Sequence, residues 1–368
     1  MSIESKKTRQ SQRILVGMSG GVDSSLAAAL LMEAGYEVTG AFMKNFSDTK
    51  DLWTGECAWK KERRDAMRVA AKLNMPLLTF DFEQQYREKV LERMFQEYEA
   101  GITPNPDILC NEEIKFGVFF QEAMKQGFDA IATGHYARVE QDTSGTWQLL
   151  KGVDKDKDQS YFLYRIPKET LSHVLFPIGA LKKDDVRRMA HERKLATADK
   201  PDSQGICFVG DLDMKTFLRK KIVSNPGDVV NPDGEVIGTH DGLDSVTIGQ
   251  RHGFHVSKGA SAWYAASKDR VQNRLIVVPN HNDKLLYTSH VLVKEMHWLG
   301  TPPQEGERVG VMVRYRAKEV MATMRDGVGK TRNLDFVEPV WGIAPGQSAV
   351  LYHGDVCLGG GFLAEPSL

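Results

Sequence analysis

Short apolar runs alternate with amphipathic stretches over the first third of the chain. An apolar run at 13–18 is followed by a helical pattern at 24–35, which ends at Gly35, a residue type favoured just after a helix. Further apolar runs at 36–43, 76–82 and 129–135 alternate with helical patterns at 59–74, 84–101 and 112–127. This alternation predicts a mostly parallel, doubly wound α/β sheet.

The pattern changes in the second half of the chain. A helical stretch at 182–195 still suits the α/β unit, but after about residue 210 turn residues recur every few positions. We therefore expect an α/β domain over 1–212, a small central domain over 213–285 and a C-terminal β-barrel-like domain over 286–368. The last domain is predicted from β-type segments that a small barrel would satisfy, at 287–298, 307–326, 331–340 and 348–363.

Composition restricts the class of protein but does not identify it. The 368 residues are 41% hydrophobic and 26% charged, and no apolar run approaches the length of a membrane span. The polar N-terminus does not resemble a secretory signal, so we expect a cytoplasmic protein whose four cysteines are thiols. A net charge of −1 argues against indiscriminate coating of nucleic acid, although local patches can still bind it.

The segment "GMSGGVDSS" at 17–25 joins a predicted strand to a predicted helix. Glycines allow a close approach of a phosphate, the hydroxyls of Ser19, Ser24 and Ser25 can donate to it, and the helix N-terminus presents free N–H groups. The segment is neither a Walker A loop nor a dinucleotide-binding glycine motif. Ligands bind at the carboxyl ends of parallel strands, so we expect this segment to converge with Met43, Gly134 and His135. For His135 a core or capping role and a place beside the nucleotide remain open.

Two cysteines lie in loop-like segments with unusual neighbours. Cys110 stands in "TPNPDILCNEEIKF", where Asn111 can cap a following helix and the helix dipole would then lower the thiol pKa. A buried, inert Cys110 is the equal alternative. Cys207 stands in "KPDSQGICFVG", 207 − 110 = 97 residues further on, which excludes a CxxC motif. We interpret Cys57 and Cys357 as structural or incidental.

The motifs in order resemble a known family. SGGVDS is similar to the PP-loop of ATP pyrophosphatases, and with AFMKN, TPNPDILCN, ATGHYAR, KDQSYFLY, DSQGICFVG, TIGQRHG and PGQSAVLYHGDVCLGGG it resembles the bacterial tRNA-specific 2-thiouridylases from about residue 13 to about 362. The resemblance implies a tRNA-uridine 2-sulfurtransferase that replaces oxygen by sulfur at C2 of the wobble uridine in tRNAs for Lys, Glu and Gln. ATP would be cleaved to AMP and pyrophosphate. The resemblance implies no dedicated metal site in the protein, and Mg²⁺ would accompany the nucleotide.

The resemblance also implies roles for individual residues. Cys207 would carry a persulfide received from a sulfur-carrier or cysteine desulfurase protein, and Cys110 would release the sulfur, with a transient Cys110–Cys207 disulfide as one route and free hydrosulfide as the other. Asp107 is a candidate general base or proton holder, or a plain turn cap, and Asp23 is a candidate Mg²⁺ or pyrophosphate residue, or a plain helix-terminal acid. The remaining implied contacts are ATP at Gly17, Met18, Ser19, Gly20, Gly21, Val22, Asp23, Ser24, Met43 and Gly134; the target base at Asn105, Pro106 and Asp107; and tRNA at Lys157, Asp158, Gln159, Arg314 and Tyr315.

Two other function classes fit part of the pattern. An amidating or ligating synthetase also uses a PP-loop, but its chemistry does not need two loop cysteines. A tRNA-binding protein with a vestigial nucleotide site is the non-enzymatic alternative, and the intact SGGVDS and both thiols weigh against it.

Overall fold

The structure is a computed structural model that describes residues 12–47, 57–202, 214–219, 221–257 and 262–365. Internal contacts divide the chain into two compact units. The first unit holds the chain up to Val90, residues 106–212 and the short stretch Asp355–Cys357, and the second holds the remainder. None of the helices in these described ranges is both long enough and apolar enough to cross a membrane.

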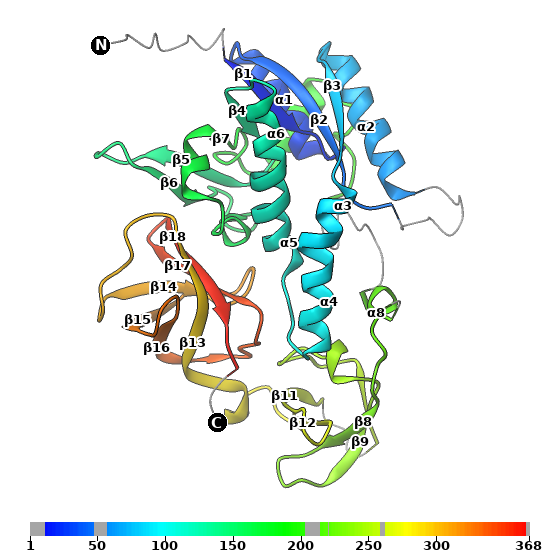
Figure 1. Cartoon of the computed structure of the whole chain (residues 1–368), viewed down its shortest axis with the longest axis vertical. Helices are drawn as coiled ribbons and strands as arrows, with labels where there is room; N and C mark the ends of the chain where they lie inside the picture. The colour runs from blue at the N-terminus through cyan, green and yellow to red at the C-terminus, as the bar shows by residue number, and fades with distance from the viewer. Residues whose placement is uncertain (1–11, 48–56, 203–213, 220, 258–261, 366–368) are drawn as a thin grey trace. The chain divides into compact units, whose positions relative to one another are not determined.

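The first unit is built on a five-stranded sheet in which every neighbouring pair is parallel (Figure 1). The strand order is β3-β2-β1-β4-β7, so the chain moves outward in one direction from β1 and then returns to its other side. This order confirms the predicted doubly wound α/β fold. The strands are β1 Arg13–Gly17, β2 Glu37–Lys44, β3 Leu77–Asp81, β4 Ala130–Ala132 and β7 Val174–Leu175.

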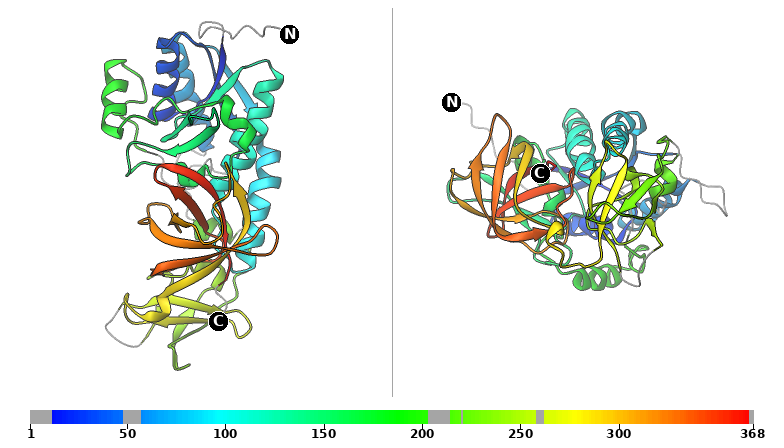
Figure 2. Two further views of the ribbon diagram at one scale, coloured as in Figure 1. Left: turned by 90° about the vertical axis from the view of Figure 1, so that its left-hand side faces the viewer. Right: turned by 90° about the horizontal axis from the view of Figure 1, so that it is seen from below.

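Helices cover both faces of this sheet (Figure 2). On one face, residues of α1 (Val22–Glu33) and α2 (Ala58–Leu73) share a core with Ile14, Val16 and Phe42. On the other face lies the helix that ends as α6 (Phe119–Lys125), where the Phe119 ring packs edge-on against Phe80 of β3 at 6.1 Å between centroids. Burial of both faces explains why the strands are continuous apolar runs.

The first unit also contains a hairpin and several helices outside the five-stranded sheet. The antiparallel hairpin of β5 (Ala137–Gln141) and β6 (Trp147–Lys151) was not expected from the sequence, and it lies between β4 and β7 along the chain. The helix α7 (Lys183–Glu192) packs on α1 through Val186 and Ala190. The remaining elements are α3 Glu83–Tyr86, the π-helical turn η2 Arg87–Leu91, α5 Pro106–Leu109, the π-helical η3 Cys110–Val118, and the 3₁₀ turns η4 Ser160–Phe162 and η5 Lys168–His173.

The second unit begins with short strands and ends in a barrel. Its small sheet has the order β10-β9-β8-β12-β11 around a core that includes Val229, Leu275 and Val277. The elements between 214 and 286 match the turn-rich pattern of the central sequence, and α4 is added to this unit from the helical stretch at 84–101. Together these elements are α4 Glu92–Glu99, α8 Met214–Leu218, β8 Gly227–Val230, β9 Val236–His240, η6 Leu243–Ser245, β10 Phe254–Val256, β11 Tyr264–Asp269, β12 Arg274–Val278 and η7 Lys284–Leu286.

The C-terminal barrel is closed. Six antiparallel strands follow in the order β13-β16-β15-β14-β17-β18, and β18 pairs back with β13. The predicted segment at 307–326 is two strands joined by a turn. Inward-facing Val311, Leu334 and Leu351 are fully buried in its core. The strands are β13 Tyr287–Trp298, β14 Arg308–Met312, β15 Val320–Asp326, β16 Arg332–Trp341, β17 Ser348–His353 and β18 Val356–Leu363.

Lys268 of β11 gives the second unit a predictable response to pH. Its Nζ donates to the carbonyl oxygen of Gly101 at 2.8 Å, and burial lowers the pKa of this lysine to about 8. The unfolded chain therefore binds more protons than the folded chain between about pH 8 and pH 10.4, and stability should rise with pH there. We expect Lys268→Met to remove this rise in the urea midpoint, while the exposed Lys318→Met keeps it. An unchanged rise in Lys268→Met would contradict the assignment.

Candidate active site

The loop between β1 and α1 can be built only with glycine at one of its positions. Gly20 has a φ of +74°, and a Cβ there would lie 2.4 Å from the carbonyl oxygen of Glu62 in α2. Both the positive φ and the close approach exclude a side chain. The loop is therefore pressed against α2, with its backbone fixed before any ligand binds.

Serine hydroxyls brace the loop from inside. Ser24 Oγ accepts from the Ser19 amide at 3.2 Å and donates to the Gly21 carbonyl at 3.2 Å, and Ser25 Oγ donates to the same carbonyl at 2.7 Å. Ser19 is exposed, whereas Ser24 and Ser25 are buried. Of the three hydroxyls expected to donate to a phosphate, only that of Ser19 is thus at the surface of the loop.

The N-terminus of α1 is an anion-binding arrangement. Gly21 is the N-cap residue and no side chain caps the helix there. The first amide groups of a helix have no partner within it, and together with the helix dipole they attract a negative charge. The predicted helix N-terminus that can bind an anion is therefore present.

Two of the residues expected around the loop do lie against it. A Cβ on Gly134 would stand 2.5 Å from the Ser24 amide nitrogen and 2.6 Å from the Asp23 carbonyl carbon. Met43 Cε lies 3.3 Å from the position that a Gly17 Cβ would take. The strand ends of β1, β2 and β4 thus meet at the loop, as expected for parallel strands.

Asp23 is held by two neighbours that the sequence did not single out. Lys183 Nζ, at the start of α7, donates to both carboxylate oxygens of Asp23 at 2.8 Å, and the Tyr136 hydroxyl donates to one of them at 2.7 Å. Burial, followed by the charge of Asp23, raises the pKa of Tyr136. These contacts favour Asp23 as a structural anion at the helix start over a direct Mg²⁺ ligand.

The same lysine reaches a second carboxylate. Lys183 Nζ is 2.8 Å from Asp202, which also accepts from Lys157 and Arg187 at 2.8 Å each. Burial acts to raise the pKa of Asp202, but its hydrogen bonds from Lys157 and Lys183 outweigh this effect and lower the pKa to about 2. Asp202 is part of the quoted motif "DSQGICFVG", and this motif was its only signal in the sequence.

His135 is buried and has two polar neighbours. Thr133 Oγ1 lies 2.6 Å from its Nδ1, and Lys115 Nζ lies 3.4 Å from its Nε2. Burial, with a smaller contribution from the charge of Lys115, holds the pKa of His135 well below its usual value. These contacts favour the core role for His135, which directly follows the Gly134 that touches the loop.

Cys110 lies inside a helix, which corrects one expectation. The helix begins at Pro106, a residue type favoured at the first helical position, and continues through η3 into α6. Asn111 is therefore not a cap, and Cys110 is not in the first turn as its predicted activation required. Cys110 is fully buried, and Asp107 lies three residues earlier, on the same face of the helix.

Two contacts fix the helix that carries Cys110. The Glu112 carboxylate accepts two hydrogen bonds from the Arg165 guanidinium, at 2.5 and 2.9 Å. The side-chain amide of Asn111 donates to the Phe162 carbonyl at 3.2 Å. Further along, the Phe116 ring lies 6.0 Å from that of His135. Cys110 is thus carried by a rigid element that packs beside the end of β4.

The other cysteines divide into described and undescribed positions. Cys207 lies outside the described residues, so its predicted role and its pairing with Cys110 stay predictions. Cys357 is buried in β18, and Cys57 precedes α2 with intermediate exposure. Within the described ranges, His, Cys, Asp and Glu side chains form no group of three suited to a metal ion.

The residues expected to contact tRNA and the target base are distributed over both units. In the first unit Lys157 pairs with Asp202, Asp158 accepts from Ser160 at 2.8 Å, and Gln159 accepts from the Tyr136 amide at 3.0 Å. Pro106 and Asp107 also belong to this unit. Asn105, Arg314 and Tyr315 belong to the second unit, where Arg314 donates to the carbonyls of Ile248 and Gly342. Their roles in binding tRNA or the base stay predictions.

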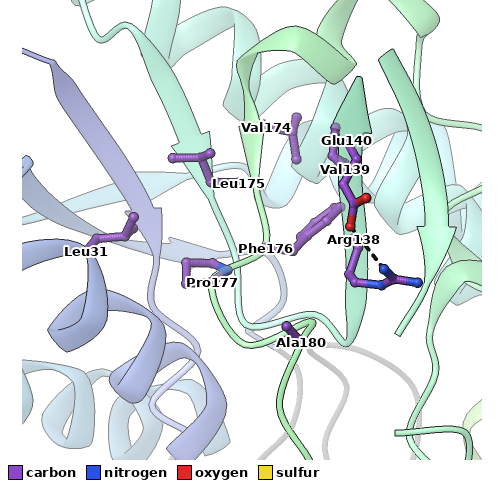
Figure 3. Close-up of a pocket in the computed structure, with 9 residues that line it drawn as sticks. All are labelled: Leu31, Arg138, Val139, Glu140, Val174, Leu175, Phe176, Pro177 and Ala180. Carbon is purple, nitrogen blue, oxygen red and sulfur yellow. Dashed lines mark hydrogen bonds and ion pairs between the residues drawn. The ribbon is translucent and has the colours of Figure 1, made fainter. Parts of the chain in front are cut away.

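A pocket of about 230 Å³ elsewhere in the first unit is not the candidate site (Figure 3). None of the predicted site residues lines it. Its wall is mostly apolar, and the ion pair of Arg138 with Glu140 closes one side at 3.0 Å. The pocket is lined by Leu31, Arg138, Val139, Glu140, Val174, Leu175, Phe176, Pro177 and Ala180.

Comparison with known proteins identifies the family. Residues 12–211 match the family described as the tRNA methyl transferase HUP domain, 215–279 its PRC-barrel domain, and 288–363 the aminomethyltransferase beta-barrel domain. The chain is 45% identical over 363 residues to a tRNA-specific 2-thiouridylase MnmA of Bacillus subtilis, covering 98% of this chain and 97% of that protein. This chain belongs to the tRNA-specific 2-thiouridylase family.

Two further relatives of the same name have similar identity and coverage. The enzyme of the same name from Neisseria meningitidis serogroup B is 45% identical over 97% of this chain and 96% of its own, and that of Cupriavidus taiwanensis is 43% identical over 96% and 98%. Among solved structures, a 4-thiouridine synthetase–RNA complex with bound ATP covers 57% of this chain and 50% of its own, with 14% identity and a TM-score of 0.34. That likeness is too low to support a functional argument.

The close contact of Gly134 with the loop generates a prediction. A methyl group there would displace Ser24 and Asp23, and overpacking of this kind costs about 1–3 kcal/mol. We expect Gly134→Ala to weaken ATP binding by about tenfold, which corresponds to about 1.4 kcal/mol in a calorimetric titration. Gly300→Ala is the control, because no atom lies within 4 Å of its added Cβ. Wild-type ATP affinity in Gly134→Ala would show that the loop geometry does not serve the nucleotide.

Proposed function

We propose that this protein carries out the ATP-dependent 2-thiolation of the wobble uridine in tRNAs for Lys, Glu and Gln. The observation that carries the proposal is the combination, within one unit, of an uncapped glycine loop and a helix that bears Asp107 and Cys110 on one face. Membership of the tRNA-specific 2-thiouridylase family supports the same substrate and reaction. We place the reaction in the cytoplasm, where thiols stay reduced.

The first step activates an oxygen that is otherwise a poor leaving group. The C2 carbonyl of uracil is urea-like, and attack of its oxygen on the α-phosphate of ATP turns it into part of an AMP leaving group and releases pyrophosphate. The amides at the start of α1 and the exposed Ser19 hydroxyl would hold the phosphates, with Met43 and Gly134 bounding the nucleotide. Mg²⁺ would arrive with ATP, bound chiefly through the phosphates and water, and would neutralise phosphate charge.

Sulfur then enters as a nucleophile. The terminal sulfur of a persulfide on Cys207 attacks C2, the C2–oxygen bond breaks and AMP leaves. The Cys110 thiolate next attacks the Cys207 sulfur, which forms a Cys110–Cys207 disulfide and releases the 2-thiouridine; a thiol reductant reopens the disulfide before the next turnover. In the second route Cys110 attacks the persulfide first and frees hydrosulfide, which then attacks C2. Asp107, on the same helix face as Cys110, would move or hold a proton on the uracil.

The substrate must present a base that is turned out of the anticodon stack. Turning out a base costs a few kcal/mol, and contacts to the flipped base and the backbone must offset it. Asn105, Pro106 and Asp107 are the proposed base contacts, and the tRNA contacts are Lys157, Asp158, Gln159, Arg314 and Tyr315. A cysteine desulfurase or a sulfur-carrier protein is the proposed persulfide donor.

The persulfide role of Cys207 is tested by its serine variant. Cys207→Ser keeps the size of the side chain but removes the sulfur acceptor, so we expect 2-thiouridine formation to disappear while ATP and tRNA binding persist. Mass analysis of tRNA after incubation with ATP and a persulfide donor reads the product. The buried Cys357→Ser serves as the control thiol. Continued thiolation by Cys207→Ser would disprove its role.

The nucleotide products test the adenylation step separately. With tRNA and a persulfide donor present, ATP should yield one AMP and one pyrophosphate for each 2-thiouridine formed. Chromatography of the nucleotides distinguishes this result from phosphoryl transfer. Formation of ADP in step with turnover would refute attack at the α-phosphate.

A further inference from the structure

Lys183 is a buried cation whose charge is already committed to two carboxylates. Its side chain is 9% exposed, and its Nζ is 2.8 Å from Asp23 of the PP-loop and 2.8 Å from Asp202. A lysine so placed without both partners would carry a large desolvation cost. The ammonium therefore bridges the nucleotide loop and a chain segment about 180 residues away in sequence.

The segment that ends at Asp202 is attached to the first unit at several points. Arg187 of α7 donates to the carbonyls of Ala198 and Lys200 at 3.0 and 3.1 Å and to Asp202 at 2.8 Å. Lys200 Nζ in turn donates to the carbonyl of Gly20 in the PP-loop at 2.9 Å, and to Asp65 at 2.8 Å. Residues 198–202 are thus tied to α7 and, by two separate cations, to the PP-loop.

Asp202 is the centre of this network. It pairs with the three cations Lys157, Lys183 and Arg187 at 2.8 Å each, and Lys183 shares its charge between Asp202 and Asp23. Asp202 precedes Cys207 by five residues in the sequence. A fixed Asp202 limits how far the chain can carry the Cys207 thiol from the nucleotide loop, because five residues span at most about 18 Å.

We propose that Asp202 and Lys183 are positioning residues, which tie the chain that leads to Cys207 to Asp23 of the PP-loop. The proposal rests on the proposed function, because it assigns the bridge to the sulfur-transfer half of the reaction. Neither residue touches the reacting atoms. Loss of the bridge would leave adenylation intact and separate it from sulfur transfer.

Asp202→Asn is the most direct test, since it removes the charge and keeps the shape. The enzyme is first loaded with persulfide by a cysteine desulfurase and cysteine, and loading is checked by the mass of one added sulfur. Pyrophosphate release and 2-thiouridine formation are then followed in a single turnover with ATP and a tRNA-Lys transcript. We expect pyrophosphate release within about twofold of wild type and thiolation slower by about 100-fold, as for a reacting group misplaced by an ångström.

Three further variants test whether the effect is specific to the Asp202 carboxylate and its contacts. Asp202→Glu keeps the carboxylate and should recover part of the thiolation rate. Asp185→Asn removes an acid of α7 whose half-exposed side chain pairs with Arg188 at 3.1 Å, and it should behave as wild type. If Asp202→Asn fails to fold in a thermal unfolding test, Arg187→Lys replaces it, because it keeps the charge but loses the fork that holds residues 198–202.

The outcomes separate this proposal from the proposed function. Equal thiolation in Asp202→Asn and wild type would overturn the proposal. So would a parallel loss of pyrophosphate release and thiolation that Asp202→Glu does not reverse, since the network would then only shape the ATP site. Failure of the wild-type enzyme to release pyrophosphate or to form 2-thiouridine would instead refute the proposed function.

Discussion

Between β1 and β4 the chain's connections leave the sheet in opposite directions, so the carboxyl ends of these two strands mark the position where ligands bind in sheets of this kind. The glycine loop starts at the end of β1, and Gly134 follows the end of β4 with no room for even a methyl group against Ser24. The backbone at Gly134 therefore packs directly against the anion-binding start of α1. The site depends on this topology more than on any single side chain.

The proposed chemistry explains why one unit should hold both a nucleotide loop and thiols. Activation of the C2 oxygen is useful only if a sulfur nucleophile reaches C2 before water does. Cys110 is buried on a helix whose Phe116 packs on His135, next to Gly134, and the segment that precedes Cys207 is tied to the PP-loop through Asp202 and Lys183. The helix that bears Cys110 and the chain up to Asp202 thus have described connections to the nucleotide loop or to its immediate neighbour.

Much of the fold was predictable, because local patterns specify it. The apolar run at 36–43 is β2, the positive φ of Gly35 ends α1 as expected, and the barrel strands follow the β-type segments near the C-terminus. The start of the Cys110 helix was mispredicted, because the prolines of TPNPD were interpreted as loop residues although Pro106 occupies the first helical turn. The bridge from Asp23 through Lys183 could not be predicted, since its partners are 160 residues apart and only the folded topology brings them together.

The central claim is that the C2 oxygen of uridine leaves as part of AMP. It is tested most directly with tRNA that carries oxygen-18 at C2 of the wobble uridine, incubated with ATP and a persulfide donor through one turnover. The account predicts that the label appears in the phosphate of AMP, in an amount equal to the 2-thiouridine formed. Label released into water or into pyrophosphate, with unlabelled AMP, would contradict it.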